Sequence, residues 1–280
     1  MFISMKWLAR HVDLTGITPE QLADDLTLST CEVEGIERFA PHMSDVVVGH
    51  VLEREPHPDA DKLGVARIDV GGEEPLQIVC GAPNLAPGQR VAVATIGTVL
   101  PGDFKIKKSK IRGVESRGMI CSVRELDLGD EHDGIWVLPE DGEAPLTVGQ
   151  PVAAALGMED WVIEVDNKSL THRPDLWGHR GIARELAAIY ERELLPIDLA
   201  MPALGGEAPV SVRVDDPAGS RYLGLAIDGA ENGASPDWLR QLLLAVGQRP
   251  IDLLVDLSNF VMLDIGQPNH AFDRDRPAGD

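Results

Sequence analysis

Between residues 45 and 150, short apolar runs are separated by turn-forming residues. The runs are rich in valine and isoleucine, which is typical of strands, and prolines, glycines and asparagines separate them. The runs are Val46–Val48, Val65–Val70, Leu76–Val79, Val91–Ile96 and Ile135–Leu138. Five strands in about 100 residues predict a small all-β barrel, of which the OB fold is one kind.

The sequence on both sides of this region favours mixed helix and strand. Thr18–Gln21 places a threonine at a helix N-cap, a proline at the first helical position and a glutamine at the capping-box position. After the barrel, Trp161–Val165 is strand-like, and the apolar spacing of Gly181–Leu195 predicts a helix ending before Pro196. We therefore expect a small α/β module with the barrel inserted in it.

The last part of the chain follows a linker rich in proline, glycine and alanine, residues 202–209. Its pattern predicts strands at Val210–Val214, Tyr222–Ile227 and Leu253–Leu257 and a helix at Pro236–Val246. The expected fold class is thus α+β and multidomain. The expected domains are residues 1–39 plus 151–200 for the N-terminal α/β module, 40–150 for the barrel, and 201–280 for an incomplete mixed α/β unit.

Composition narrows the class of protein. No apolar run approaches the ~18 residues that a membrane helix needs, and no secretory signal opens the chain. The three cysteines are widely spaced and fit neither a disulfide framework nor a zinc site. His57, Asp59 and Asp61 lie beside two prolines, which favours a tight turn over a metal site. We expect a cytoplasmic chain with reduced thiols, no metal site and no membrane partner.

One basic segment departs from the acidic character of the chain, whose net charge is −21. Between residues 101 and 120, six cations face only Asp103 and Glu115. The cations are Lys105, Lys107, Lys108, Lys110, Arg112 and Arg117. Closely spaced cations release counterions from nucleic-acid phosphates, although a lysine-rich hairpin that only protects a sheet edge is an alternative. Phe104 is the only aromatic nearby, so we expect recognition of backbone and shape rather than base stacking, which disfavours a single-stranded-DNA-binding protein.

Three motifs in the barrel region resemble the tRNA-binding OB domain that several synthetases and their cofactors share. They are Pro58–Leu63, Gln77–Asn84 and Lys107–Ser122, in that order and spacing. The resemblance implies that the six cations of the basic segment bind tRNA.

The flanking sequence resembles the N-terminal portion of bacterial phenylalanyl-tRNA synthetase β subunits. The matching stretches are Met5–Leu14, Glu32–Ile36, Asn167–His179, Arg249–Phe260 and Gly266–Asp273. The resemblance implies an OB fold followed by the start of an editing domain, tRNA(Phe) as ligand, and a catalytic α subunit as partner in an α2β2 heterotetramer. It also implies ATP and Mg²⁺ for the holoenzyme, with the aminoacylation site and the Mg²⁺ carboxylates outside this fragment.

The resemblance further implies an editing role, the hydrolysis of tyrosine wrongly attached to tRNA(Phe). His270, Asn259 and Ser258 are the candidate editing residues: His270 would hold a water, and the other two would bind the amino acid or the terminal adenosine. The chain has Ser258, Phe260 and Asn269 where family members often have threonine, tyrosine and methionine. The residues alone also allow a helix or turn cap at Ser258 and a loop position for His270.

Two further hypotheses concern the function of the whole chain and the role of one polar cluster. A free-standing tRNA-binding OB-fold protein without a catalytic role is the alternative function, but such a protein has no use for the 167–190 and 249–273 stretches. The polar cluster Thr171–Asp175 lacks the context of a hydrolase triad, so we expect Arg173 and Asp175 to form a structural ion pair or a helix cap.

Overall fold

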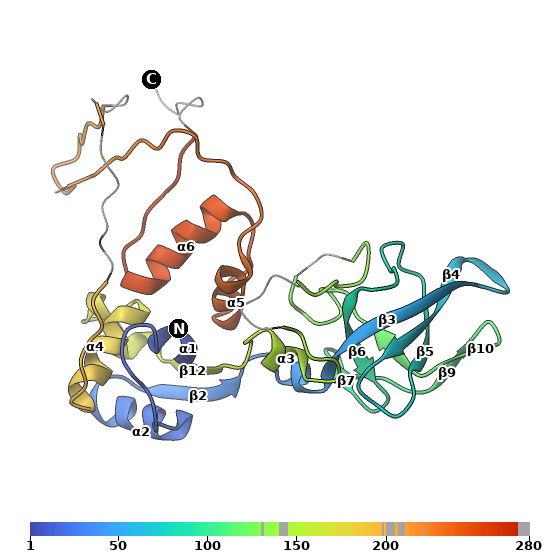
Figure 1. Ribbon diagram of the computed structural model, residues 1–280. Helices are drawn as coiled ribbons and strands as arrows, with labels where there is room; N and C mark the ends of the chain where they lie inside the picture. Colours follow the sequence, from blue (N-terminus) through green and yellow to red (C-terminus); the bar gives the residue numbers. More distant parts are fainter. Residues whose placement is uncertain are drawn as a thin grey trace.

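The fold was analysed in a computed structural model (Figure 1). It describes residues 1–129, 132–139, 145–197, 199, 205–206, 211–219 and 221–273. Figure 1 shows the barrel at one end of the molecule and the N-terminal module at the other, with α5 and α6 lying against that module. The chain runs out from the module into the barrel and then returns to it.

The N-terminal module is built around a three-stranded antiparallel sheet, in the order β1 (Phe2–Ser4), β12 (Trp161–Val165) and β2 (Val33–Arg38). The central strand pairs Ile163 with Ile3 on one side and with Ile36 on the other. Segments from before and after the barrel therefore share one sheet, as the predicted α/β module with an inserted barrel requires.

Helices α1 (Met5–Leu8), α2 (Pro19–Ser29) and α4 (His179–Ile189) complete the module. The predicted N-cap is confirmed, because the Thr18 side chain accepts the backbone N–H of Gln21 at 3.1 Å. Helix α4 ends earlier than predicted, close to Glu191, whose positive φ of 51° is incompatible with a continuing helix. The fully buried core of the module includes Leu22, Leu26, Ile163, Ile182 and Leu186.

The barrel is a five-stranded sheet in the order β11-β6-β3-β4-β5, with every pair antiparallel. Its strands are β3 (Val46–His57), β4 (Ala60–Asp69), β5 (Leu76–Cys80), β6 (Arg90–Thr95) and β11 (Gly118–Ile120). It comes close to closing where the N–H of Arg117 donates to the carbonyl of Gln77 at 2.8 Å. The predicted OB-like barrel is confirmed, and its interior is filled so tightly that a Cβ on Gly49 would lie 2.5 Å from Val93.

The prediction of a fifth barrel strand at Ile135–Leu138 is wrong. Ile135–Leu138 forms only an isolated bridge, Val137 to Val91, and the fifth position belongs to β11. β6 already pairs with β3 along one side, and β11 pairs with half of the other side, from Val93 to Thr95. Only one end of β6 is left for the 135–138 segment.

The C-terminal part contains helices α5 (Asp237–Ala245) and α6 (Leu253–Ile265). The helix predicted at Pro236–Val246 is confirmed, but the strand predicted at Leu253–Leu257 is the start of α6. A short apolar run does not distinguish a strand from a buried helix, and here capping decides. Asp252 accepts the N–H of Val255 at 3.0 Å, and Gly266, with a φ of 74°, ends the helix.

The other two predicted strands, Val210–Val214 and Tyr222–Ile227, are also not strands. Val210 lies outside the described residues, and the described stretches 211–214 and 222–227 have no strand conformation. A strand requires a hydrogen-bonded neighbour, and no described segment pairs with these. Their side chains are accordingly exposed, Leu223 by 78% and Ile227 by 71%. Separately, none of the described helices is both long enough and apolar enough to cross a membrane.

Candidate functional site

The basic segment ends in a tight hairpin on the barrel. Strands β9 (Ser109–Ile111) and β10 (Val114–Ser116) are joined by Arg112 and Gly113, with φ values of 45° and 86°. Positive φ at both turn residues is the type I′ geometry that suits the twist of a two-residue hairpin. Lys110 lies directly opposite Glu115 in this hairpin, and Arg112 is at its tip.

Glu115 divides the six cations into two groups. Its carboxylate binds Lys108 Nζ at 2.8 Å and Arg117 Nε at 2.5 Å. These hydrogen bonds, that from Lys108 first, hold the pKa of Glu115 below its usual range. The cations without an ion pair to any described residue are Lys105, Lys107, Lys110 and Arg112, and all four are exposed. Phosphate contacts would therefore fall mainly to this free set.

His57 fixes the hairpin to the barrel. Its Nε2 lies 3.0 Å from the carbonyl oxygen of Ile111, and its Nδ1 accepts the N–H of Asp59 at 3.0 Å. The imidazole is buried, and both nitrogens are used in holding the turn. The hydrogen bond from the N–H of Asp59 to His57 Nδ1 is a local contact within the turn that the sequence predicts.

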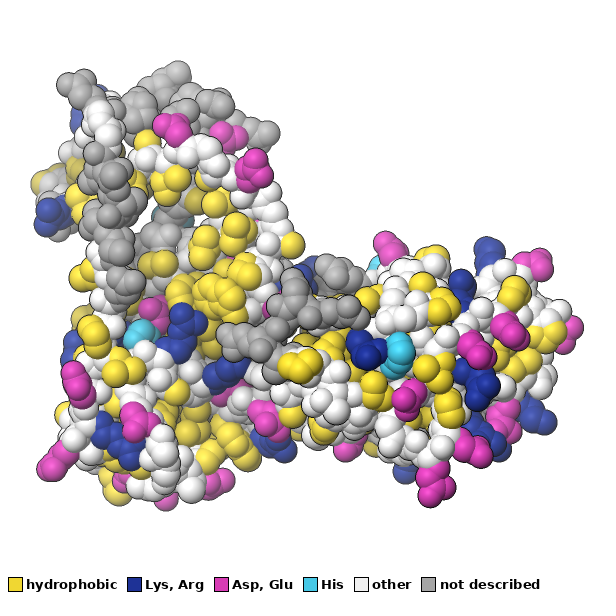
Figure 2. Space-filling model, in the orientation of Figure 1, with side chains coloured by type: hydrophobic (Ala, Val, Ile, Leu, Met, Phe, Trp, Pro, Cys, Tyr) yellow, Lys and Arg dark blue, Asp and Glu magenta, His cyan; other side chains and the backbone are white. Residues whose placement is uncertain are grey.

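Lys105 lies in a second small hairpin, formed by β7 (Val99–Leu100) and β8 (Phe104–Lys105). The Phe104 ring beside it is 57% exposed, so one aromatic surface is open to a ligand. On the face shown in Figure 2, Lys and Arg side chains gather on the part of the barrel farthest from the N-terminal module, with acidic side chains among them.

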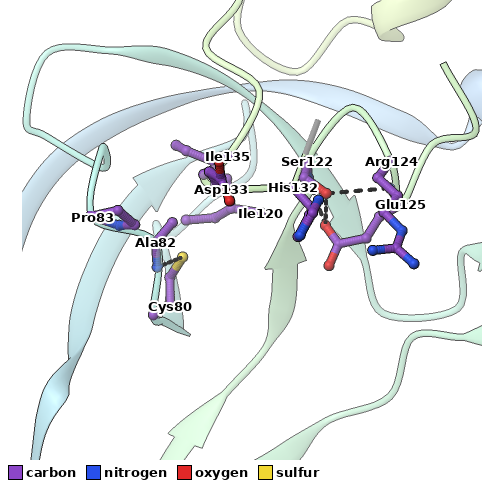
Figure 3. Close-up of a pocket in the computed structure, with 12 residues that line it drawn as sticks. Cys80, Ala82, Pro83, Ile120, Ser122, Arg124, Glu125, His132, Asp133 and Ile135 are labelled. Carbon is purple, nitrogen blue, oxygen red and sulfur yellow. Dashed lines mark hydrogen bonds between the residues drawn. The ribbon is translucent and has the colours of Figure 1, made fainter. Parts of the chain in front are cut away.

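A cavity of about 590 Å³ opens on the barrel between the ends of β5 and β11 (Figure 3). Ser122 and Glu125 form part of its wall, and Glu125 Oε2 accepts the N–H and the Oγ–H of Ser122 at 2.6 and 2.9 Å. Asn84 holds the facing loop by exchanging two hydrogen bonds of 2.9 Å with the backbone of Ile135. Sequence reasoning assigned no site here, although Ser122–Glu125 carries the S-x-x-E spacing of a capping box.

The candidate editing residues lie on and after α6. Ser258 Oγ donates to the carbonyl of Asn269 at 2.9 Å, and Asn269 Nδ2 donates to the carbonyl of Ser258 at 3.1 Å. This pairing folds the segment carrying His270 back along the helix, while Asn259 is half-buried beside Ser258. His270 is exposed, and its ring centroid lies 6.2 Å from that of Phe272.

The predicted role of the Thr171–Asp175 cluster is confirmed. The Arg173 guanidinium binds both carboxylate oxygens of Asp175, at 2.9 and 2.8 Å, and Glu185 of α4 at 2.7 Å. The Arg173 hydrogen bonds lower the pKa of Asp175 to about 2. These hydrogen bonds connect the loop before α4 to that helix.

Sequence reasoning missed an aromatic stack between the N-terminal module and α6. Trp7 is fully buried, with the His179 ring 4.0 Å away on one face and the Phe260 ring 5.0 Å away on the other. The interplanar angles are 12° and 7°. The only sequence signal for this stack is that Trp7 and His179 both lie in stretches that resemble the synthetase β subunits.

Hydrogen bonds surround this stack. Asp264 Oδ1 accepts Trp7 Nε1–H at 2.7 Å and His11 Nε2–H at 2.6 Å. Burial alone would raise the pKa of Asp264, but these hydrogen bonds lower it overall. His179 Nδ1 donates to the carbonyl of Leu263 at 2.8 Å, and its Nε2 accepts the N–H of Ser4 at 3.1 Å. Burial lowers the pKa of His179 to about 4, so the imidazole is neutral.

Comparisons with known proteins agree with this geometry. Residues 46–146 match the family described as putative tRNA binding domain, and residues 218–280 match the B3/4 domain family. The phenylalanine–tRNA ligase beta subunit of Bacillus licheniformis is 46% identical over 286 residues, covering 99% of this chain and 35% of that one. The Bacillus subtilis subunit is 45% identical with the same coverage. Over nearly its whole length the chain is therefore similar to part of the phenylalanine–tRNA ligase beta subunits.

The chain spans about a third of the length of the beta subunits that it matches. Among solved structures, the C-terminal domain of Plasmodium vivax p43 is 29% identical and covers 38% of this chain and 59% of that one, with a TM-score of 0.28. The similarity to the beta subunits nevertheless extends along nearly the whole of this chain, including the barrel.

Proposed function

We propose that this chain binds tRNA(Phe) through its barrel and contributes part of the site at which a phenylalanine–tRNA ligase β subunit hydrolyses Tyr-tRNA(Phe). The free, exposed cations Lys105, Lys107, Lys110 and Arg112 carry the tRNA-binding half of the proposal. They belong to the domain that matches a tRNA-binding family, in a chain with a net charge of −21. Local positive potential, rather than net charge, attracts phosphates.

The test of tRNA binding is the salt dependence of affinity. Changing Lys107, Lys110 and Arg112 together to alanine should weaken tRNA(Phe) binding, because each lost phosphate contact removes roughly 0.7–0.9 from the slope of log K against log salt. Titrations of tRNA(Phe) at several salt concentrations measure both quantities.

A matched control removes the same charge elsewhere. Lys168, Arg213 and Arg221 are exposed cations outside the barrel, and their triple alanine variant should leave the slope near that of the unchanged chain. An equal loss of slope in both variants would show that only net charge matters, and an unchanged slope in the barrel variant would refute the role of the free set.

The editing half follows from the substrates. An apolar pocket rejects tyrosine, which adds one hydroxyl to phenylalanine, only about a hundredfold, so a second hydrolytic pocket is needed. A pocket that hydrogen-bonds this hydroxyl would reject phenylalanine, because its own polar groups would be left unpaired. We assign the water-holding role to His270 and substrate contacts to Ser258 and Asn259. The hydrogen-bonded pair Ser258–Asn269, which brings the His270 segment to α6, supports this assignment.

The remaining properties of the whole enzyme are also proposals for this chain. They are a catalytic α subunit as partner, an α2β2 heterotetramer, cytoplasmic location, and ATP with Mg²⁺ as requirements of the holoenzyme. We propose no ATP or Mg²⁺ site within this chain. The proposed domain limits are 1–39 plus 151–200, 40–150 and 201–280.

The free-standing tRNA-binding protein is the weaker proposal. Its barrel would need none of the sequence after residue 150, yet the similarity to beta subunits extends over 99% of the chain.

A further inference from the structure

Trp7 comes from the N-terminal module, but its side chain lies in the core of the two C-terminal helices. The apolar side chains packed around it are Leu239, Leu242, Leu243, Val246, Leu253, Phe260 and Leu263. Trp7 is fully buried among these neighbours, with a relative solvent accessibility of 0%. The packing of α5 against α6 therefore includes a residue from the opposite end of the sequence.

Two contacts of Trp7 determine how α6 is rotated about its axis. The Phe260 ring stacks on the indole at 5.0 Å, nearly parallel to it. Asp264, four residues and about one turn later, accepts the indole Nε1–H at 2.7 Å. Because one contact requires parallel rings and the other requires a directed hydrogen bond, both hold only over a narrow range of rotation.

His179 fixes the other side of the indole. It stacks on Trp7 at 4.0 Å, and its own nitrogens bind the backbone of Ser4 in the module and of Leu263 in α6. Close backbone approach adds a further restraint, since a Cβ on Gly178 would lie 2.5 Å from the amide nitrogen of Gly266 at the end of α6. The N-terminal module therefore contacts α6 along the C-terminal half of that helix.

Ser258 lies on the opposite face of this helix. At 3.6 residues per turn, Ser258 is about 160° around the axis from Phe260. It points away from Trp7 and holds Asn269, the residue before His270. Any rotation of α6 against the module would therefore move Ser258 and the His270 segment together.

We infer that Trp7, supported by His179, is a positioning residue for the editing site: it sets the rotation of α6 and hence the placement of Ser258 and His270. The inference rests on the proposed editing function. Trp7 itself contacts no substrate, and the N-terminal module contributes to editing by orienting a helix of the next domain.

The test uses the full-length β subunit assembled with its α subunit. Phe260→Leu removes the ring that stacks on Trp7, whereas Phe260→Tyr keeps that ring. Trp7→Phe keeps an aromatic ring but loses the N–H that donates to Asp264. Trp136→Phe, a substitution of the same kind in the barrel, is the matched control. The measurements are kcat and KM for Tyr-tRNA(Phe) hydrolysis, the rate of phenylalanine charging, and deuterium uptake by α6.

We expect Phe260→Leu to lower the hydrolytic kcat roughly ten- to a hundredfold, because small misplacements of reacting groups cost this much. KM for Tyr-tRNA(Phe) and phenylalanine charging should stay unchanged, and uptake by α6 should rise. Trp7→Phe should show the same pattern to a smaller extent, while Phe260→Tyr and Trp136→Phe should behave as wild type. Rescue by tyrosine separates ring stacking from a general loss of packing.

Three results would overturn the inference. In the first, Phe260→Leu increases uptake by α6 but leaves kcat unchanged; in the second, uptake by α6 does not change. In the third, Phe260→Tyr is as impaired as Phe260→Leu. A wild-type assembly that does not hydrolyse Tyr-tRNA(Phe) is a different result, because it refutes the proposed editing function, and the inference with it.

Discussion

His179 shows how one buried side chain links pH to the stability of this protein. Both of its nitrogens are engaged with backbone groups in the neutral form, as donor to Leu263 and as acceptor from Ser4. A proton on Nε2 would replace the acceptor with a second donor facing the Ser4 N–H. Burial also disfavours the charged form and lowers the pKa of His179 to about 4.

A pH-dependent stability follows from this shift. Above about pH 6.5 His179 is neutral in both folded and unfolded chains, but below it the unfolded chain binds a proton that the folded chain does not bind until about pH 4. Stability should therefore fall by roughly 3 kcal/mol as pH falls through this window. Urea unfolding of the chain at pH values from about 7 to about 4 measures the loss.

The variant His179→Gln isolates this contribution, because glutamine can keep both hydrogen bonds and does not titrate. It should lose less stability than wild type across the same pH window. The prediction fails if both proteins show the same dependence of stability on pH, since other groups, such as Asp264, would then account for it.

At the scale of elements, local sequence signals were reliable where a backbone group needs a particular partner. Thr18 caps α2 as predicted. The prediction failed at Leu253–Leu257, where an apolar run fits either helix or strand. Capping by Asp252 and termination at Gly266 would have indicated the helix from sequence.

The hairpin turn offers a test that changes no charge. Gly113 has a φ of +86° and open space around it, so Gly113→Ala strains the backbone without a clash. We expect this substitution to lower the free energy of unfolding by about 1 kcal/mol. It should also weaken tRNA(Phe) binding, because the strain distorts the hairpin that carries Lys110 and Arg112. Thermal unfolding and tRNA titration measure the two effects.

Gly88 provides the control for this prediction. Its φ is +91°, it also has open space, and it lies in the loop before β6, outside the basic segment. Gly88→Ala should lower the free energy of unfolding by a similar amount and leave the affinity for tRNA(Phe) unchanged. Equal affinities for the two variants would show that the shape of the hairpin does not matter for binding.

At the scale of the whole molecule, the N-terminal module and α6 should respond together and the barrel separately. The module is fastened to α6 through the Trp7 stack and the His179–Leu263 hydrogen bond. The barrel has its own apolar interior, which includes Ile68, Ile78 and Val93. Cooperative units in a protein usually follow such shared cores.

Two cavity-forming variants test this division. Leu22 and Ile78 are both fully buried, Leu22 in the module and Ile78 in the barrel. Each change to alanine should cost about 2–5 kcal/mol. Hydrogen exchange of the α6 amides should speed up in Leu22→Ala and stay close to wild type in Ile78→Ala. Equal acceleration in both variants would mean that the molecule unfolds as one unit.

The sequence by itself determined the local features of this protein: four of the five barrel strands, the capped helix α2, the Arg173–Asp175 pair and the basic segment. These depend on neighbours in the chain or on short-range periodicity, which a single sequence contains. Long-range pairings were decided only by the tertiary structure. They include β11 in place of 135–138 as the fifth strand, Glu115 neutralising Lys108 and Arg117, and Trp7 packed against α6. Each of these arises from competition between distant segments for one edge, one charge or one core position, and no local pattern records the outcome.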